Sequence, residues 1–170
     1  MNIIPIHYNK SLPVSNWQAI IDDANEIARM IDENDIRYED GRYYTGKALA
    51  LHHTQVTNTP FNFFVVTSLV GEQILQELGS RFIVNPKIDM LMPDSIQKVG
   101  EGCVSFPFKK EKNVERAYVC GVTYQVPDIK GEGGLRTVQK QVAGLVAQMF
   151  QHECDHAEGS NIYYKTPKGE

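Results

Sequence analysis

The first clear pattern of apolar and polar positions is helical and covers residues 15–32. Apolar side chains recur there every three or four positions with acidic side chains opposite, which is the spacing of an amphipathic helix. Ser15 is the expected N-cap, because a serine side chain can accept a hydrogen bond from the first turn. The pattern predicts a helix near the N-terminus that packs one face on the core.

Two segments in the middle of the chain have the composition of strands. Residues 63–69 and 81–84 are rich in β-branched and aromatic side chains. The dipeptide Asn85-Pro86 is expected to end the second segment, because proline cannot donate a backbone hydrogen bond.

A third strand-like segment, residues 114–126, alternates apolar with polar positions. Arg116 is the exception, a charged residue at one of the positions that are otherwise apolar. This alternation predicts a half-buried antiparallel strand, or two strands joined near Gly121. A glycine-rich turn is expected over residues 128–134.

The last strong pattern predicts a helix over residues 137–157. Its apolar stripe is continued by His152 and His156, so both imidazoles are expected to point inward; the apolar members are Val138, Val142, Leu145 and Met149. Strands followed by one long helix favour an α+β fold, with mixed or antiparallel strands packed around a long C-terminal helix. The 170 residues fit one domain, residues 1–170.

The sequence QHECDH at residues 151–156 carries the strongest chemical signal. Two histidines four apart lie on one helix face and can hold one metal ion, and Glu153 lies close enough to move protons there. A third ligand must come from elsewhere, and Cys103 in the sequence EGCVS is the candidate. A thiolate and two imidazoles leave one coordination position open, which is typical of a catalytic metal site. The backbone N–H of Val104 could then stabilise an oxyanion.

Composition narrows the possible partners and the compartment. The net charge of -4 argues against nucleic acid as the main partner, because phosphate binding needs a basic surface. The three cysteines cannot all pair in disulfides, and a thiolate ligand needs a reducing compartment; Cys120 and Cys154 are expected to be structural. We find neither a signal-peptide pattern nor a bilayer-length apolar run, so we expect a cytoplasmic protein without a membrane partner.

These motifs together resemble the peptide deformylase family, whose members remove the formyl group from the initiator methionine. The resemblance covers roughly residues 44–157 and rests on EGCVS, on QHECDH, on VERA at residues 114–117 and on FIVNPKI at residues 82–88. The family's first motif, Gly-x-Gly-Leu-Ala-Ala-x-Gln, is altered here to ALALHHTQ at residues 48–55. Its glycines are alanines, and its two alanines are His52 and His53, which are expected to be exposed or packed beside a strand.

The resemblance implies roles for specific positions. The metal ligands would be Cys103, His152 and His156, with Glu153 as general acid and base and with Gln55 and the N–H of Val104 on the formyl oxygen. The substrate would pair with backbone at Ala50 and Leu51, and its methionine would lie against Leu145 and Met149. Gln148 stands where the family usually has an aliphatic residue.

The resemblance also implies a cofactor and a partner. The ion would be Fe²⁺, with Zn²⁺, Ni²⁺ or Co²⁺ able to occupy the same site. The substrates would be N-formylmethionyl nascent peptides, met at the ribosome by a monomeric enzyme. Three alternatives remain open at this point: an amidohydrolase with altered acyl or peptide specificity, a non-catalytic metal- or peptide-binding homologue, and a conventional zinc peptidase.

Overall fold

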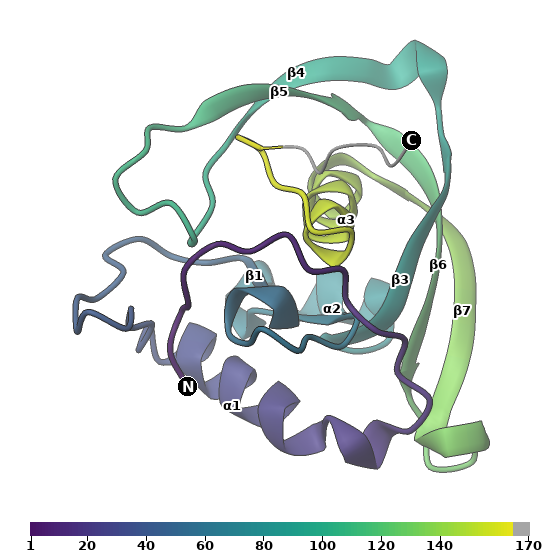
Figure 1. The fold of residues 1–170 in the computed structure, drawn as a ribbon. Coiled ribbons are helices and arrows are strands. Elements are labelled where there is room, and N and C mark those ends of the chain that lie inside the picture. The colour runs from purple at the N-terminus through teal and green to yellow at the C-terminus, as the bar shows by residue number, and fades with distance from the viewer. Residues whose placement is uncertain (165–170) are drawn as a thin grey trace.

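The computed structural model describes residues 1–164 and confirms the α+β class (Figure 1). An antiparallel five-stranded sheet has the order β1-β2-β3-β6-β7, and β4 and β5 form a separate two-stranded sheet. The strands are β1 Ala50–His52, β2 Phe63–Val66, β3 Phe82–Leu91, β4 Ile96–Glu101, β5 Lys112–Ala117, β6 Val119–Pro127 and β7 Leu135–Ala143. The helices are α1 Ile21–Asp32, α2 Glu72–Leu78 and α3 Gly144–Ala157. No helix in this described part of the chain is both long and apolar enough to cross a membrane.

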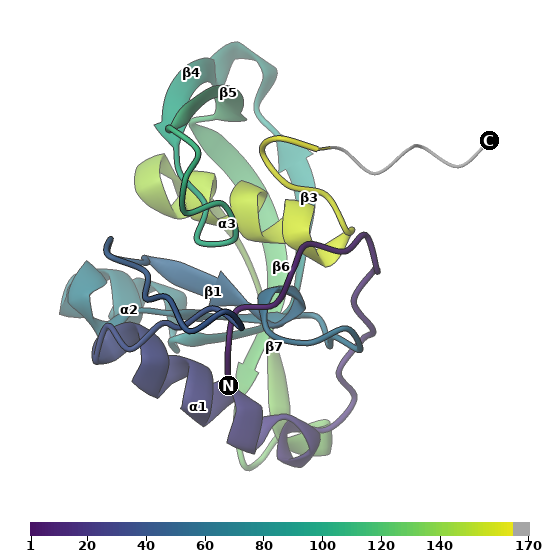
Figure 2. The same ribbon diagram turned by 60° about the vertical axis from the view of Figure 1, so that its left-hand side comes forward.

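Helix α3 lies in the middle of the fold. The β4–β5 hairpin arches over one side of it, β1 and β2 lie on the other side, and α1 lies beyond them (Figures 1 and 2). Strand β2 separates two hydrophobic cores and is buried on both faces. Phe63 and Val65 face the core beneath α1, whereas Phe64 and Val66 face the core that includes α3. An unbroken apolar sequence is therefore what this strand requires.

The first helix begins later than its pattern predicts. A short 3-10 helix, Trp17–Ala19, precedes α1, and the cap is Asn16, whose side chain accepts a hydrogen bond from the N–H of Gln18 (2.9 Å). Ser15 is therefore not the N-cap. Asparagine and serine are about equally good caps, so the neighbouring sequence alone does not choose between them.

Strand β3 runs through Asn85-Pro86, so the prediction that this dipeptide ends the strand is wrong. Asn85 has a positive φ of 49° and lies at a register shift between Val84 and Lys87. Its side chain exchanges two hydrogen bonds with the backbone of Val14, at 2.8 and 2.7 Å. At this register shift residue 86 does not need to donate a backbone hydrogen bond to the neighbouring strand, so the strand tolerates a proline there. The first segment also ends early, since β2 stops at Val66.

Residues 114–126 form two strands, as one of the two predictions had it, but the break lies at Tyr118 instead of Gly121. Strand β5 pairs with β4, whereas β6 pairs with β3 and β7. The alternating apolar side chains of β6 point into the core as predicted, and the buried ones are Cys120, Val122, Tyr124 and Val126. Tyr118 is half exposed where the chain passes from one sheet to the other.

The long C-terminal helix is shorter than predicted. Helix α3 begins at Gly144, and residues 137–143 belong to β7, which pairs with β6. Val138 and Val142 are four positions apart, and this spacing places two side chains on one face of a helix and also on one face of a strand. Gly144 has φ of +61°, and this left-handed conformation, which glycine adopts without strain, turns the chain from strand to helix.

Candidate metal centre and its cleft

The structure brings Cys103, His152 and His156 together. One ligand atom from each lies within 4.8 Å of the other two, and Cys103 Sγ is 3.4 Å from His156 Nε2. Cys103 follows the end of β4, and both histidines are on α3. A soft thiolate and two imidazoles at this separation suit one divalent transition-metal ion. Neither His52 nor His53 belongs to this cluster.

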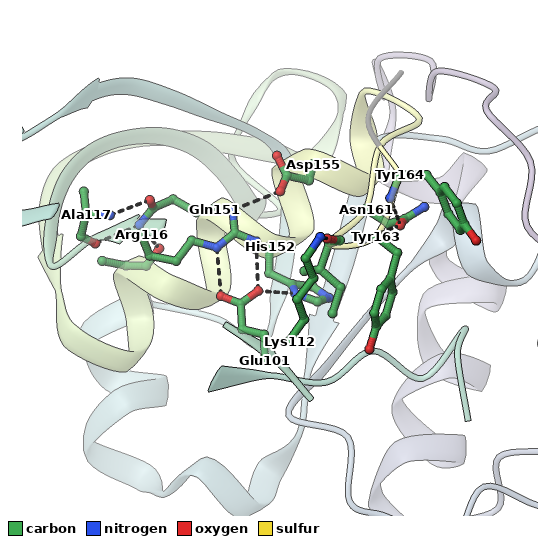
Figure 3. Close-up of polar contacts among 12 residues, drawn as sticks. Glu101, Lys112, Arg116, Ala117, Gln151, His152, Asp155, Asn161, Tyr163 and Tyr164 are labelled. Atoms are coloured by element: carbon green, nitrogen blue, oxygen red, sulfur yellow. Dashed lines mark hydrogen bonds and ion pairs between the residues drawn. The ribbon is translucent and has the colours of Figure 1, made fainter. Parts of the chain in front are cut away.

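A buried ion-pair network supports His152 from behind (Figure 3). His152 Nδ1 donates to Glu101 Oε1 at 2.8 Å, and Arg116 donates two hydrogen bonds of 2.8 Å to the same carboxylate. Arg116 also reaches Asp155 at 2.9 Å. Burial alone would raise the pKa of Glu101, but the hydrogen bonds from Arg116 and His152 outweigh it and lower the pKa to about 2. The ionised carboxylate holds a proton on His152 Nδ1, which leaves Nε2 as the ring nitrogen that could bind a metal ion in place of its proton.

Sequence reasoning assigned no role to Glu101, Arg116 and Asp155. The available signal for Arg116 was that it stands, in an alternating strand-like segment, at a position whose side chain is expected to point toward the core. A charged side chain at a buried position needs partners, and the acids of the two flanking motifs are those partners.

Gln151 anchors α3 to β5 next to the Cys/His/His cluster. Its Oε1 accepts a hydrogen bond from the N–H of Ala117 at 2.8 Å, and its Nε2 donates to the carbonyl of Ala117 at 2.9 Å (Figure 3). A single side chain thus satisfies both backbone groups at the end of β5. The two hydrogen bonds fix the helix just before His152.

Glu153 lies beside the cluster with an unsatisfied oxygen. Its side chain is buried, and Oε2 has no hydrogen-bond partner among the described residues. Burial raises the pKa of Glu153 to about 7. A buried carboxylate oxygen without a partner is costly and rare in folded proteins. The observation fits a site completed by groups from outside the chain, namely a cation and a proton-bearing ligand.

Gln55 approaches the cluster from the other side. It closes a 3-10 turn, His53–Gln55, and its Oε1 accepts from the N–H of His52 at 3.0 Å. Its Nε2 donates to Ser105 Oγ at 3.0 Å and lies 3.7 Å from Cys103 Sγ. The side-chain amide is therefore fixed beside the candidate thiolate ligand.

The loop that carries Val104 is held by a residue that sequence reasoning missed. The hydroxyl of Tyr38 donates to the carbonyl of Val104 at 2.6 Å, in a buried contact. This bond fixes the Val104–Ser105 peptide. The Val104 N–H belongs to the preceding peptide, whose Cys103 carbonyl accepts a hydrogen bond from the N–H of Phe106 at 2.9 Å. No local sequence signal connects Tyr38 with a loop so far along the chain.

The two histidines of the altered first motif are packed, not exposed. His52 is fully buried between Thr54 and Asn62, and burial lowers its pKa to about 3, so its ring is neutral. His53 donates to Asp23 at 2.9 Å. Its ring stacks on that of Phe61, with centroids 6.2 Å apart, and lies tilted against that of Phe63 at 4.5 Å. Both side chains fill space and satisfy polar groups.

A cleft of about 360 Å³ opens beside the cluster. Cys103, Val104, Gln55 and Glu153 line it, and so do three of the expected substrate residues, Ala50, Leu145 and Met149. The side chain of Leu51 does not reach the cleft, because it is fully buried in the core beneath α1. Among the described residues, only Asn34 and Asn85 combine a side chain with a positive φ, so Ala48 and Ala50 hold their places without strain.

Comparison with known proteins agrees with this geometry. A family profile described as polypeptide deformylase matches residues 8–169. A peptide deformylase of Thermotoga maritima is 32% identical over 155 residues, which is 91% of this chain and 77% of that protein. One of Thermus thermophilus is 32% identical over 97 residues, which is 57% of this chain. The match spans about half (47%) of the length of that Thermus relative.

Solved structures of low identity share the fold. The crystal structure of peptide deformylase from Thermotoga maritima has a TM-score of 0.70 at 24% identity, covering 98% of this chain and 99% of that chain. A peptide deformylase structure from Plasmodium falciparum has a TM-score of 0.71 at 23% identity, covering 98% and 87%. That of a probable peptide deformylase from synechococcus phage S-SSM7 has a TM-score of 0.69 at 22% identity, covering 96% and 97%.

Fold and site together define an α+β protein with a Cys/His/His cluster in the wall of a cleft. The family match covers nearly the whole chain. The chain belongs to the polypeptide deformylase family.

Proposed function

We propose that this chain is a metal-dependent hydrolase that removes the formyl group from N-formylmethionyl peptides and releases formate. The observation that carries this proposal is the buried carboxylate of Glu153 beside the Cys103, His152 and His156 cluster, whose Oε2 has no hydrogen-bond partner among the described residues. A site that only binds a metal has no use for such a group. Family membership supports the same reading, and the relatives are themselves named peptide deformylases.

Cys103, His152 and His156 would hold one divalent ion, and Fe²⁺ is the ion that we propose, with Zn²⁺, Ni²⁺ or Co²⁺ as substitutes. Such an ion would polarise the formyl carbonyl and make water a stronger nucleophile near neutral pH. The Glu101 carboxylate would hold His152 in the tautomer that binding needs.

Glu153 would carry the proton through the reaction. Its pKa of about 7 suits a group that both accepts and returns a proton at neutral pH. As water adds to the formyl carbon, Glu153 accepts the proton of the water; as the C–N bond breaks, it gives that proton to the departing amine nitrogen. The products are formate and a peptide with a free amino terminus.

Gln55 and Val104 would stabilise the oxygen that becomes negatively charged. The Gln55 amide nitrogen has two N–H groups: it donates to Ser105 Oγ at 3.0 Å and more weakly to Cys103 Sγ at 3.7 Å, and the N–H in the weaker contact would turn to the oxyanion. The backbone N–H of Val104 would be the second donor, and the hydrogen bond from Phe106 N–H to the Cys103 carbonyl orients the peptide that carries it. Donors fixed in advance at an oxyanion are each worth roughly 3 kcal/mol in the barrier.

The strand edge at the cleft would bind the peptide. Within residues 1–164, strand β1 pairs with β2 alone and its other edge carries no strand, and Ala50 lies both on β1 and on the cleft. An extended peptide could add to this edge as a further strand, which gives affinity through backbone hydrogen bonds. Leu145 and Met149 would then contact the first side chain. We propose nascent chains in the cytoplasm as the natural substrates and a monomeric enzyme that meets them at the ribosome.

The test is formate release from formyl-Met-Ala by anaerobically purified protein. We expect release that requires added Fe²⁺, and none from acetyl-Met-Ala, because the cleft must place a small acyl group between Glu153 and Gln55. Equal cleavage of both peptides would instead support an amidohydrolase of altered acyl specificity. A protein that binds one metal ion per chain but cleaves neither peptide would be a binding homologue.

A further inference from the structure

One polar side chain in the cleft has no use in the reaction described above. Gln148 lies on α3 one turn before His152 and lines the cleft together with Leu145 and Met149. Its side chain is half-buried, and no hydrogen bond within residues 1–164 involves its carboxamide. This carboxamide has no partner from the described chain and is therefore available to a ligand that enters the cleft.

The position of Gln148 on the helix determines what it can contact. Side chains three and four residues apart on a helix are neighbours, so Leu145, Gln148, Met149 and His152 form one continuous surface. A peptide whose acyl group lies between Glu153 and Gln55 must direct its first side chain along that surface. The stem of this side chain would contact Leu145 and Met149, and its tip would reach the amide of Gln148.

The chemistry of the wall therefore favours a particular kind of side chain. Leu145 and Met149 suit a flexible apolar stem, whereas the Gln148 amide offers two N–H donors and a carbonyl acceptor. The thioether of methionine is only a weak acceptor, so it leaves this amide poorly satisfied. Methionine sulfoxide has the same stem and carries a strongly polar oxygen at the right depth. N-formylmethionyl peptides remain substrates, and a first side chain whose tip accepts a hydrogen bond from Gln148 is favoured further by about one hydrogen bond.

We propose that this cleft selects formyl peptides whose first side chain has an apolar stem ending in a hydrogen-bonding group, with methionine sulfoxide as the form derived from methionine. The proposal rests on the deformylase function proposed above and names its substrate class. Gln148 is the residue that sets this preference, by donating an N–H to the polar tip.

The experiment compares formyl-Met(O)-Ala, where Met(O) is methionine sulfoxide, with formyl-norleucine-Ala, whose side chain has similar length and no acceptor. The measured quantity is the ratio of the two kcat/KM values within one preparation, which cancels differences in metal loading. Gln148→Leu should lower this ratio by about threefold to tenfold, the effect of one hydrogen bond. Gln139→Leu makes the same change at an exposed position on β7, away from the cleft, and should leave the ratio unchanged.

A binding measurement gives a second readout that does not depend on turnover. In the Glu153→Ala background, calorimetry with the same two formyl peptides should show the same dependence of their Kd ratio on Gln148. If formyl-Met-Ala is cleaved but Gln148→Leu leaves both ratios within twofold of the starting protein, the specificity proposal is wrong and the deformylase function stands. If no formyl peptide is cleaved or bound, both proposals fall together.

Discussion

Replacing Arg116 by methionine tests whether the buried network behind His152 stabilises the fold as its geometry indicates. The side chains of Arg116 and Glu101 are 8% and 4% exposed, so neither charge has water as an alternative partner. Arg116→Met leaves the carboxylate of Glu101 buried with His152 as its one remaining partner. Removing one member of a buried ion pair costs about 3–5 kcal/mol. We expect the low end, about 3 kcal/mol, because His152, whose pKa is raised to about 10, is positively charged in metal-free protein at neutral pH and still contacts the Glu101 carboxylate.

Urea unfolding of metal-free protein at neutral pH measures this cost without a contribution from metal binding. For a chain of this size the loss corresponds to a fall in Tm of about 6–12 °C. Arg136→Met is the matched control, because the side chains of Arg136 and Asp128 are 54% and 30% exposed. An exposed pair of this kind contributes less than about 1 kcal/mol.

A second substitution separates the uncompensated charge from lost packing. Glu101→Gln, added to Arg116→Met, removes the buried charge while keeping the shape of the side chain. The double variant should therefore be more stable than Arg116→Met alone. The reasoning is refuted if Arg116→Met costs no more than Arg136→Met, or if the double variant is the less stable of the two.

Two further substitutions test other contacts. Asp32 forms two hydrogen bonds with Arg81, at 2.7 and 2.8 Å, and these hold the pKa of Asp32 at about 2 against an ordinary value of 3.8. Because the folded pKa is depressed, the contribution of about 2 kcal/mol is complete above pH 4 and is lost as the pH falls through 2. Urea midpoints between pH 5 and 2 should thus fall less for Asp32→Asn than for the starting protein, and parallel curves would exclude this pair as a source of stability. Gln151→Leu removes both hydrogen bonds to the backbone of Ala117 and leaves a buried N–H and C=O unpaired, at a cost of about 2 kcal/mol or more. A loss under about 0.5 kcal/mol in urea unfolding would show that α3 does not depend on this anchor.

The candidate site could be predicted from sequence because its chemistry is concentrated in short motifs. His152, Glu153 and His156 share one helical turn, so local spacing alone fixes their relation, and the structure places Cys103 beside them. Tyr38 and the ion pairs of Arg116 could not be predicted in the same way. Their partners are far away in the chain, and no local pattern encodes contacts of that kind.

The errors in the fold have physical reasons of the same kind. The start of α3 was misplaced because Val138 and Val142 share a face in a helix and in a strand alike. Strand β3 continues through Asn85-Pro86 because Val14, a distant residue, supplies the partner for the Asn85 side chain. For His52 and His53 the expectation of packing beside a strand is confirmed, but their partners Asn62 and Asp23 could not be predicted, because only the folded chain brings them together.

The central claim is that Glu153 moves the proton while Cys103, His152 and His156 hold the ion. The most direct measurement is formate release from formyl-Met-Ala by iron-loaded Glu153→Ala protein, with the iron content per chain determined on the same sample. We predict that iron binding is retained at one ion per chain, and that kcat falls by at least about a hundredfold, the effect of removing a general acid and base. Retention of kcat within a few-fold of the starting protein, with iron still bound, would contradict this account of the site.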